Sequence, residues 1–235
     1  MKKYYFSVSL MVFAFTSLAF ADEPLIENTE LQSQEQAREV VQTQIDNDET
    51  EALVQAMHRE QFRHTNTARI QKIIEDAQDA GLPTKPLTDK VYEGIAKNVD
   101  EDGIVLAVSR VRNRYMHAYQ QALQLAVDPE EEENLGDLIA GAYAAGLRQD
   151  ECDAIMAALQ TRTRTMNRSQ AHDLAIRTIA TARIMAHRQV RSETISDVLV
   201  SALNKSYKAA DMYVMERSFT DRARHGSAEE VAQLF

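Results

Sequence analysis

Apolar residues recur at three- and four-residue steps along almost the whole chain after residue 50, which is the period of an α-helix. The clearest run begins just after Gly103 and continues for about six helical turns. Its apolar positions are Ile104, Val108, Val111, Tyr115, Ala118, Ala122 and Leu125. No segment shows a convincing alternation of apolar and polar residues, as a half-buried strand would. The pattern therefore predicts an all-α fold.

Shorter stretches of the same pattern predict further helices. They cover residues 50–61, 68–80, 86–98, 135–145, 151–160, 171–186 and 195–214, with a short last helix that opens at Ser227. The stripe over 195–214 is formed by Ile195, Leu199, Ala202, Ala209, Tyr213 and Val214. Together the stretches predict an elongated bundle or a short array of helical hairpins, with about seven to nine helices.

Two stretches of the chain repeat each other at an offset of 65 residues, from Ile73 to Leu138, and both end in Ala-Gly-Leu. A glycine just past a helix end readily adopts the left-handed conformation that closes the last turn. Gly81 and Gly146 are therefore predicted to end helices. The alignment predicts a helical domain over 50–235 with a weak internal repeat of about 70–127 and 135–189.

The first of these glycines also belongs to a recognisable pattern. Ala80-Gly81-Leu82-Pro83 is followed by Leu87, Lys90 and Glu93-Gly94-Ile95-Ala96-Lys97-Asn98-Val99. This resembles a pattern of secreted bacterial helical proteins of unassigned function, which reads roughly GLP…L…K…EGLAKGV, over about 35 residues. The chain departs from it at Asn98, where glycine is usual. The resemblance implies a secreted helical scaffold, but no activity and no site residues.

The beginning of the chain predicts export. Lys2 and Lys3 precede an uncharged, mostly apolar run over 4–18, and Ala19-Phe20-Ala21 fits a cleavage site, so residues 1–21 form the signal peptide that we predict. Residues 22–49 are acidic and poor in large apolar side chains, which predicts a flexible leader. No later segment is apolar enough to span a bilayer. We therefore expect a periplasmic or secreted protein without a transmembrane segment.

Charge is distributed unevenly along the chain. The net charge is −10, and it becomes −12 without Lys2 and Lys3. Residues 22–159 carry 28 acidic and 12 basic side chains, net −16, whereas residues 160–224 carry 6 acidic and 12 basic side chains, net +6. This asymmetry either guides association or only reflects solvated faces. An exported acidic chain without aromatics interleaved among basic residues argues against nucleic acid as a partner.

Three arginines in the connector over 161–168 are the candidate partner-binding residues: Arg162, Arg164 and Arg168. They can bind acidic groups of another envelope protein or of a second copy of the chain, for instance its Glu130–Glu133 cluster. Exposed ion pairs are weak and salt screens them, so the association should be weak and salt-dependent. The alternative is that the connector is simply a solvated loop.

The acidic stretch Asn98-Val99-Asp100-Glu101-Asp102-Gly103 is the clearest ligand-like motif. Oxygen side chains at its first, third and fifth positions and glycine at its sixth are those of the first half of a calcium-binding loop. Ser109 stands at the twelfth position, where such a loop needs a carboxylate. The alternative, which we expect, is a turn in which Asp100 or Asp102 caps the helix that follows.

Two further positions carry side chains with possible chemical roles, Cys152 and His172-Asp173. Cys152, the only cysteine, shares a helical face with Ile155 and Leu159, which predicts a buried side chain, and a single cysteine allows no disulfide within the chain. His172-Asp173 is a pair that some all-α metal phosphohydrolases use, but those enzymes also need another histidine and a distant aspartate, and the sequence singles out neither. His172 also borders an apolar stripe, which favours a boundary position.

These observations predict an exported, non-enzymatic helical envelope protein that acts as a protein-binding or assembly scaffold, without a cofactor. Motifs for a serine nucleophile, a zinc protease or a phosphate loop do not occur in the sequence. Two alternatives stay open at this stage. One is a metal-dependent hydrolase that uses His172 and Asp173; the other is a periplasmic holdase chaperone, for which the nine methionines are a hint.

Overall fold

A computed structural model of the chain describes residues 49–235, and every regular element within them is a helix. A first helix covers 49–59. The others are α2 (His64–Asp79), α3 (Lys85–Ala96), α4 (Glu101–Ala122), α5 (Pro129–Ala145), α6 (Gln149–Thr163), α7 (Arg168–His187), α8 (Ser192–Asn204), α9 (Ala209–Arg222) and α10 (Ala228–Ala232). The all-α prediction is confirmed. The proposed signal peptide, and the leader apart from Glu49, lie outside the described residues.

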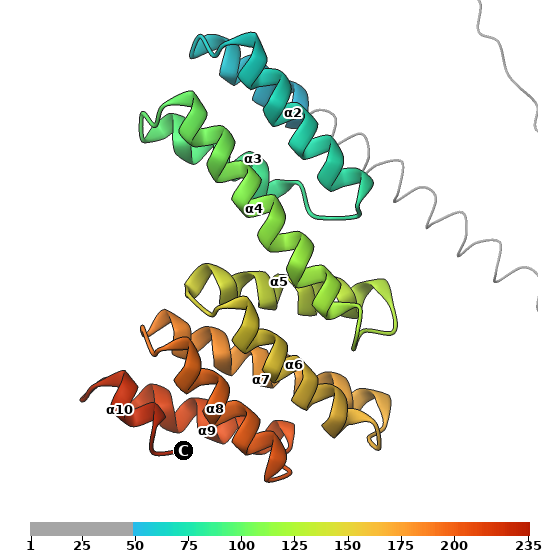
Figure 1. Cartoon of the computed structure of the whole chain (residues 1–235), viewed down its shortest axis with the longest axis vertical. Helices are drawn as coiled ribbons and strands as arrows, with labels where there is room; N and C mark the ends of the chain where they lie inside the picture. The colour runs from blue at the N-terminus through green and yellow to red at the C-terminus, as the bar shows by residue number, and fades with distance from the viewer. Residues whose placement is uncertain (1–48) are drawn as a thin grey trace, which may run out of the picture. The chain divides into compact units, whose positions relative to one another are not determined.

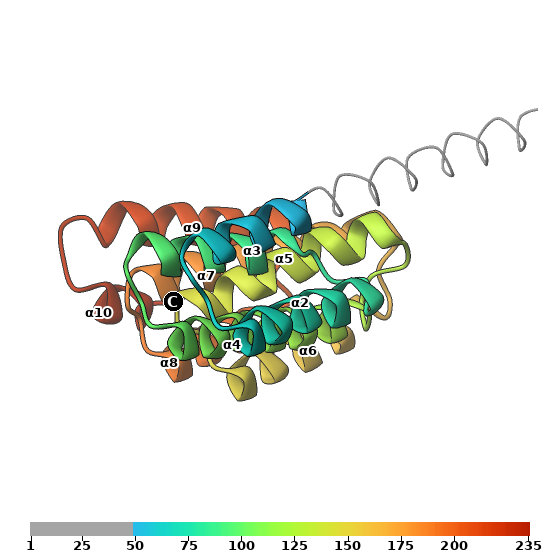
Figure 2. The same cartoon turned by 90° about the horizontal axis from the view of Figure 1, so that it is seen from above.

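Successive helices fall into two layers, which are seen edge-on in Figure 2. One layer holds α2, α4, α6 and α8, and the other holds the helix over 49–59 with α3, α5, α7 and α9. Within the layers, α2 packs on α4, α6 on α8, α5 on α7 and α7 on α9. The result is an array of helical hairpins that follow one another in chain order down the long axis of Figure 1.

Helix α4 joins the two ends of this array. It is 22 residues long and packs against α2, α3 and α5. Its predicted apolar stripe is largely confirmed, because Val108 and Val111 are buried. Leu199 of α8, predicted for the core, is buried as well. Tyr115 is only partly buried, because it lies at the edge of a cleft that is described below.

The predicted stripe over 195–214 is confirmed as far as Ala202 and wrong beyond it, because two helices occupy this stretch. Helix α8 ends at Asn204, and Ser206 has φ of +65°, in the left-handed region. The helix that follows buries Met212, Met215 and Phe219, and leaves Tyr213 and Val214 exposed. Serine at a left-handed position gives no recognisable stop signal, so the apolar spacing was continued across a break. With this break, the described residues contain ten helices rather than the predicted seven to nine.

The same helix ending recurs at six places. A residue with positive φ follows the helix, and the amide of the next residue donates to the carbonyl oxygen five residues earlier, at 2.9 to 3.2 Å. The positive-φ residues are Gln61, Gly81, Asn98, Gly146, Gln189 and Ser206. The two glycines were predicted. Asn98 replaces the glycine of the resemblance pattern, and asparagine enters this region more readily than most residues.

Helix starts are joined to one another across the array. The residue before α2, α6 and α8 is an arginine whose side chain does not cap its own helix. Its backbone amide instead donates to a side chain in the first turn of another helix, which ties α2 to α4, α6 to α8 and α8 to α10. The three bonds are Arg63 to Glu101 Oε2 (2.9 Å), Arg148 to Ser192 Oγ (2.8 Å) and Arg191 to Glu229 Oε2 (2.9 Å).

Candidate functional site

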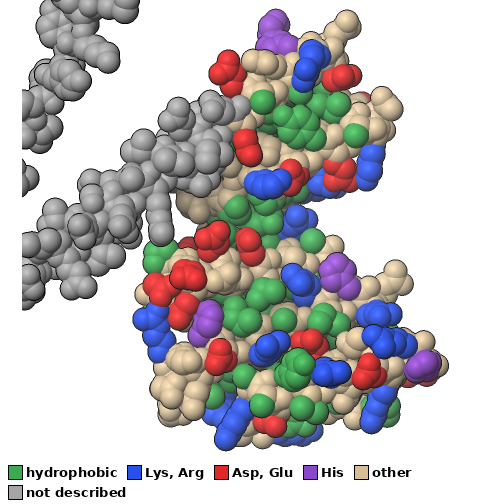
Figure 3. All heavy atoms as spheres, turned by 180° about the vertical axis from the view of Figure 1, so that it is seen from behind, with side chains coloured by type: hydrophobic (Ala, Val, Ile, Leu, Met, Phe, Trp, Pro, Cys, Tyr) green, Lys and Arg blue, Asp and Glu red, His purple; other side chains and the backbone are tan. Residues whose placement is uncertain are grey.

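A cleft of about 630 Å³ lies where α4, α5 and α7 meet. Its walls are formed by Tyr115 of α4, by Asn134, Asp137, Leu138 and Gly141 of α5, and by His172, Ile176 and Arg183 of α7. Figure 3 shows the molecule from the side of the layer that contains α5, α7 and α9. Basic and hydrophobic side chains are interspersed over the lower half of this view.

Two glycines of α5 shape this part of the fold. A Cβ at Gly136 would lie 2.5 Å from Cδ2 of Tyr119, so the glycine lets that ring lie directly on the α5 backbone. A Cβ at Gly141 would lie 3.0 Å from Cδ of Arg183, so the stem of this arginine can cross α5 at the cleft. Glycine inside a helix costs stability, and here it permits two close contacts.

Polar groups around the cleft are partly engaged by neighbours. The hydroxyl of Tyr119 donates to Asp137 Oδ1 at 3.2 Å. His172 Nδ1 lies 3.8 Å from Glu131 Oε1. Burial raises the pKa of Tyr115, and the nearby carboxylate of Asp137 adds to this effect. The phenol of Tyr115 is therefore protonated at neutral pH and available as a hydrogen-bond donor.

The apolar part of the cleft comes from two aliphatic side chains. Leu138 and Ile176 are partly buried and pack against the core while they also line the cleft. A surface that combines aliphatic side chains with tyrosine, arginine and carboxylate groups can bury apolar residues of a partner and hydrogen-bond its polar atoms. This combination is typical of a protein-binding surface.

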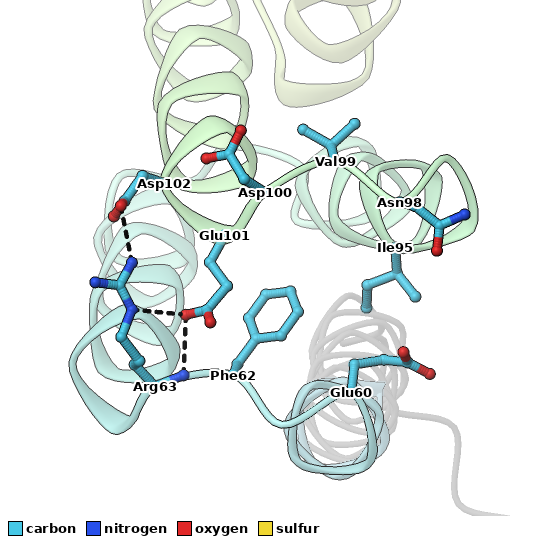
Figure 4. A pocket seen from close by; sticks show the side chains of 9 residues that line it. All are labelled: Glu60, Phe62, Arg63, Ile95, Asn98, Val99, Asp100, Glu101 and Asp102. Atoms are coloured by element: carbon cyan, nitrogen blue, oxygen red, sulfur yellow. Dashed lines mark hydrogen bonds and ion pairs between the residues drawn. The ribbon is translucent and has the colours of Figure 1, made fainter.

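A second cleft, of about 450 Å³, lies at the turns before α2 and α4 (Figure 4). Glu101 and Asp102 point toward Arg63, whose guanidinium donates to Glu101 Oε2 at 3.3 Å and to Asp102 Oδ2 at 2.8 Å. Hydrogen bonds from Arg63 lower the pKa of both carboxyl groups. These groups therefore hold two helix starts together.

The calcium-like motif lies in this second cleft, and the structure makes it a capped turn. Asp100 accepts a hydrogen bond from the amide of Gly103 at 2.8 Å, and α4 already begins at Glu101. The prediction that Asp100 or Asp102 caps the helix is confirmed for Asp100. Asp102 instead accepts hydrogen bonds from Arg63 and Asn66.

The three candidate arginines of the connector have different surroundings. Arg162 is partly buried at the end of α6, and its Nη2 lies 3.4 Å from the carbonyl oxygen of Ser206. Arg164 is exposed. Arg168 is paired within its own chain, because it contacts Asp128 and its Nε donates to Glu131 Oε1 at 3.2 Å. Self-association through this connector stays a prediction. The ion pair between Arg168 and Glu131 forms within one molecule.

The pair His172-Asp173 does not form the centre that a hydrolase would need. His172 lines the cleft, whereas Asp173 is exposed and is not part of its lining. Within residues 49–235, no three His, Cys, Asp or Glu side chains are grouped as metal ligands. Cys152 is buried as predicted, and burial raises the pKa of its thiol to about 11.

Sequence reasoning missed the cleft itself. Its residues come from three helices and include Leu138, Ile176 and Arg183, none of which belongs to a motif. Gly141 was the one available signal, because a glycine in a helix interior often permits a close approach.

Comparisons with known proteins identify no relative of this chain. No protein family model, no curated protein and no solved structure matches it. Among the described residues, none of the helices has both the length and the apolar character that crossing a membrane would require.

Proposed function

We propose that this chain is an exported, non-enzymatic helical protein that binds a segment of another protein in the cleft between α5 and α7. The observation that carries the proposal is the cleft itself, which combines the aliphatic side chains of Leu138 and Ile176 with hydrogen-bonding groups such as Tyr115. Export is supported by the sequence of residues 1–21.

The helical array also supports this role. The cleft is built on α5 and α7, which pack together and approach closely where Gly141 of α5 meets the stem of Arg183 on α7. A binding surface on packed helices is more rigid than one on loops, which lowers the entropic cost of association.

Selection of linear peptides tests the proposal. A random library of peptides, each about 16 residues long, is displayed on phage and selected against the whole mature chain. We expect selected peptides to lose about tenfold or more in affinity for Ile176→Asp, because a charge replaces an aliphatic contact. Val200→Asp is the matched control, since Val200 is also a partly buried β-branched residue but lies on α8.

The result that would overturn the proposal is also clear. Either no peptide is enriched above background, or the enriched peptides bind Ile176→Asp as tightly as they bind the wild type. Circular dichroism of both variants shows whether the helical fold is intact, so that a lost contact can be told from a lost fold.

A further inference from the structure

Next to the cleft, Tyr213 of α9 lies between two arginines. The guanidinium carbon of Arg177, on α7, is 5.1 Å from the centre of the tyrosine ring, and that of Arg217 is 5.9 Å from it. Arg217 Nη1 also lies 3.5 Å from the tyrosine hydroxyl. The tyrosine side chain is 40% exposed, so this group of three, the Arg–Tyr–Arg patch, is open to solvent.

The two arginines of the patch make no ion pair with any carboxylate in residues 49–235. Asp173 lies one helical turn before Arg177, where a salt bridge commonly forms. The guanidinium of Arg177 is nevertheless placed over Tyr213. A guanidinium that stacks on an aromatic ring keeps its N–H donors free at the edge, where they can bind a carboxylate with two hydrogen bonds.

Some other arginines of the described chain are paired, whereas others, such as Arg164 and Arg188, likewise form no ion pair. Arg63, Arg148, Arg168 and Arg191 each contact a carboxylate and join secondary-structure elements. The patch thus keeps unneutralised positive charge on a chain whose net charge is −10. Arg177 packs on Tyr213 where α7 meets α9, and both arginines are exposed, so the patch can bind an anionic group of a partner as well as support this packing.

Apolar residues adjoin the patch in sequence on both α7 and α9. Val214, the residue after Tyr213, is 62% exposed. Ile176, the residue before Arg177, lines the cleft. The face in Figure 3 shows basic and hydrophobic side chains interspersed with acidic ones. Tyrosine and arginine are the residue types that most often dominate binding energy at protein interfaces.

We propose that Arg177, Tyr213 and Arg217 bind carboxylate side chains of an acidic protein segment whose apolar residues occupy the neighbouring cleft. This inference rests on the proposed function and specifies the chemistry of the partner. A short acidic segment is favoured over a second copy of the chain, because mature copies carry a net charge of −12 each and repel one another. Nucleic acids and anionic membranes present a far larger density of negative charge than a short segment, so the net charge of the chain disfavours them more strongly.

The peptide selection described above also tests this inference. We expect the selected peptides to be enriched in Asp and Glu relative to the library. Their affinity should fall about tenfold or more for Arg177→Glu/Arg217→Glu, because two donors of charge-assisted hydrogen bonds become repulsive. The milder pair Arg177→Gln/Arg217→Gln should give a smaller loss in the same direction.

A matched control separates the patch from general electrostatics. Arg188→Glu/Lys205→Glu changes the net charge by the same amount, and both residues are exposed and form no ion pair within residues 49–235. This variant should leave the affinity of the selected peptides nearly unchanged. If Arg177→Glu/Arg217→Glu and Arg188→Glu/Lys205→Glu lose the same amount of peptide affinity, the inference is overturned.

Other outcomes distinguish this inference from the proposed function. Peptides that need Ile176 but lack acidic enrichment and ignore the arginine changes would overturn the inference and leave the proposed function standing. Failure to enrich any peptide would overturn both. Two results would contradict the inference. Sedimentation of the wild type with vesicles of about 30% phosphatidylglycerol, abolished by Arg177→Glu/Arg217→Glu, would assign the patch to membrane binding. A wild-type dimer in light scattering, abolished by the same variant, would assign it to self-association.

Discussion

Single side chains fix where several helices of this chain begin. Asp100, Asp128 and Asn167 each accept a hydrogen bond from a backbone amide in the first turn of the helix that follows. Such an amide has no partner within its own helix. The cap therefore replaces water with a fixed acceptor and stabilises the helix start.

Loss of the α4 cap should have a measurable cost. We expect Asp100→Ala to reduce the free energy of unfolding by about 1 kcal/mol, because the amide of Gly103 loses its acceptor. Asp100→Asn keeps an acceptor and should be nearly neutral. Urea denaturation of the three proteins measures the difference. Added calcium should leave the melting temperature of the wild type unchanged, and a rise of several degrees that Asp100→Asn abolishes would contradict the capping account.

Glu229 should make stability depend on pH. Hydrogen bonds from the Thr194 hydroxyl and the Arg191 amide lower its pKa to about 2, from an ordinary value of 4.5. Because the pKa in the folded state is below that in the unfolded state, the carboxylate stabilises the fold above about pH 4.5 and loses this contribution as the pH falls toward 2. Glu229→Gln should therefore be less stable than the wild type at pH 7.

The difference in free energy of unfolding between Glu229→Gln and the wild type should become smaller as the pH is lowered from 5 toward 2. Urea denaturation at pH 7, 5 and 3 measures this gap directly. Glu230→Gln is the matched control, since Glu230 is the adjacent residue and forms no ion pair within residues 49–235. A gap that is the same at every pH would show that Glu229 does not act through its charge.

At the scale of elements, the packing of α4 on α5 depends on a glycine. We expect Gly136→Ala to lower the free energy of unfolding by about 1–3 kcal/mol, because the new methyl group would meet the Tyr119 ring at 2.5 Å. Gly141→Ala is its control in the same helix. There the nearest atom is Cδ of the flexible Arg183 side chain, so higher helix propensity should make the change neutral or stabilising, by up to about 1 kcal/mol.

Thermal and urea unfolding of both variants check this contrast. The opposite order, with Gly141→Ala the more destabilised, would show that the ring of Tyr119 can move away and that α4 and α5 are not tightly packed. Both residues lie inside α5, so helix propensity alone predicts the same effect for each.

Helices were predictable where the pattern and the caps agreed. The stripe of α4, the Asp128-Pro129 start of α5 and the endings at Gly81 and Gly146 all have local signals that the structure confirms. The break at Ser206 has none, because a serine and not a glycine takes the left-handed position there, before the amide of Tyr207 closes the turn on the carbonyl oxygen of Ala202. Local sequence therefore indicates a helix ending only where the residue after the helix itself favours the left-handed conformation.

The site was less accessible from sequence than the fold. His172 was noted only because a histidine next to an aspartate resembles a metal pair, and the structure places the two in different surroundings. Tyr213 was assigned to the core because its spacing was counted from Leu199 across the break. Which helices become neighbours is decided by tertiary packing, which no local pattern encodes.

For the molecule as a whole, α4 is the element on which both ends of the array depend. Val111→Asp should leave the chain unfolded, because Val111 is 3% exposed and a buried unpaired charge costs several kcal/mol against a total stability of about 5–15 kcal/mol. Leu106→Asp is the control on the same helix, since Leu106 is 52% exposed. Circular dichroism should show a folded Leu106→Asp protein, and a cooperative melt for Val111→Asp would contradict this account.

Binding on the face of α5, α7 and α9 is the central claim, and hydrogen exchange of the whole mature chain tests it most directly. Amide exchange is measured by mass spectrometry with and without the tightest-binding displayed peptide. We predict slower exchange in α5, α7 and α9, and unchanged exchange in α2 and α3. Protection confined to α2 and α3, or to the turns that form the cleft of Figure 4, would contradict the claim.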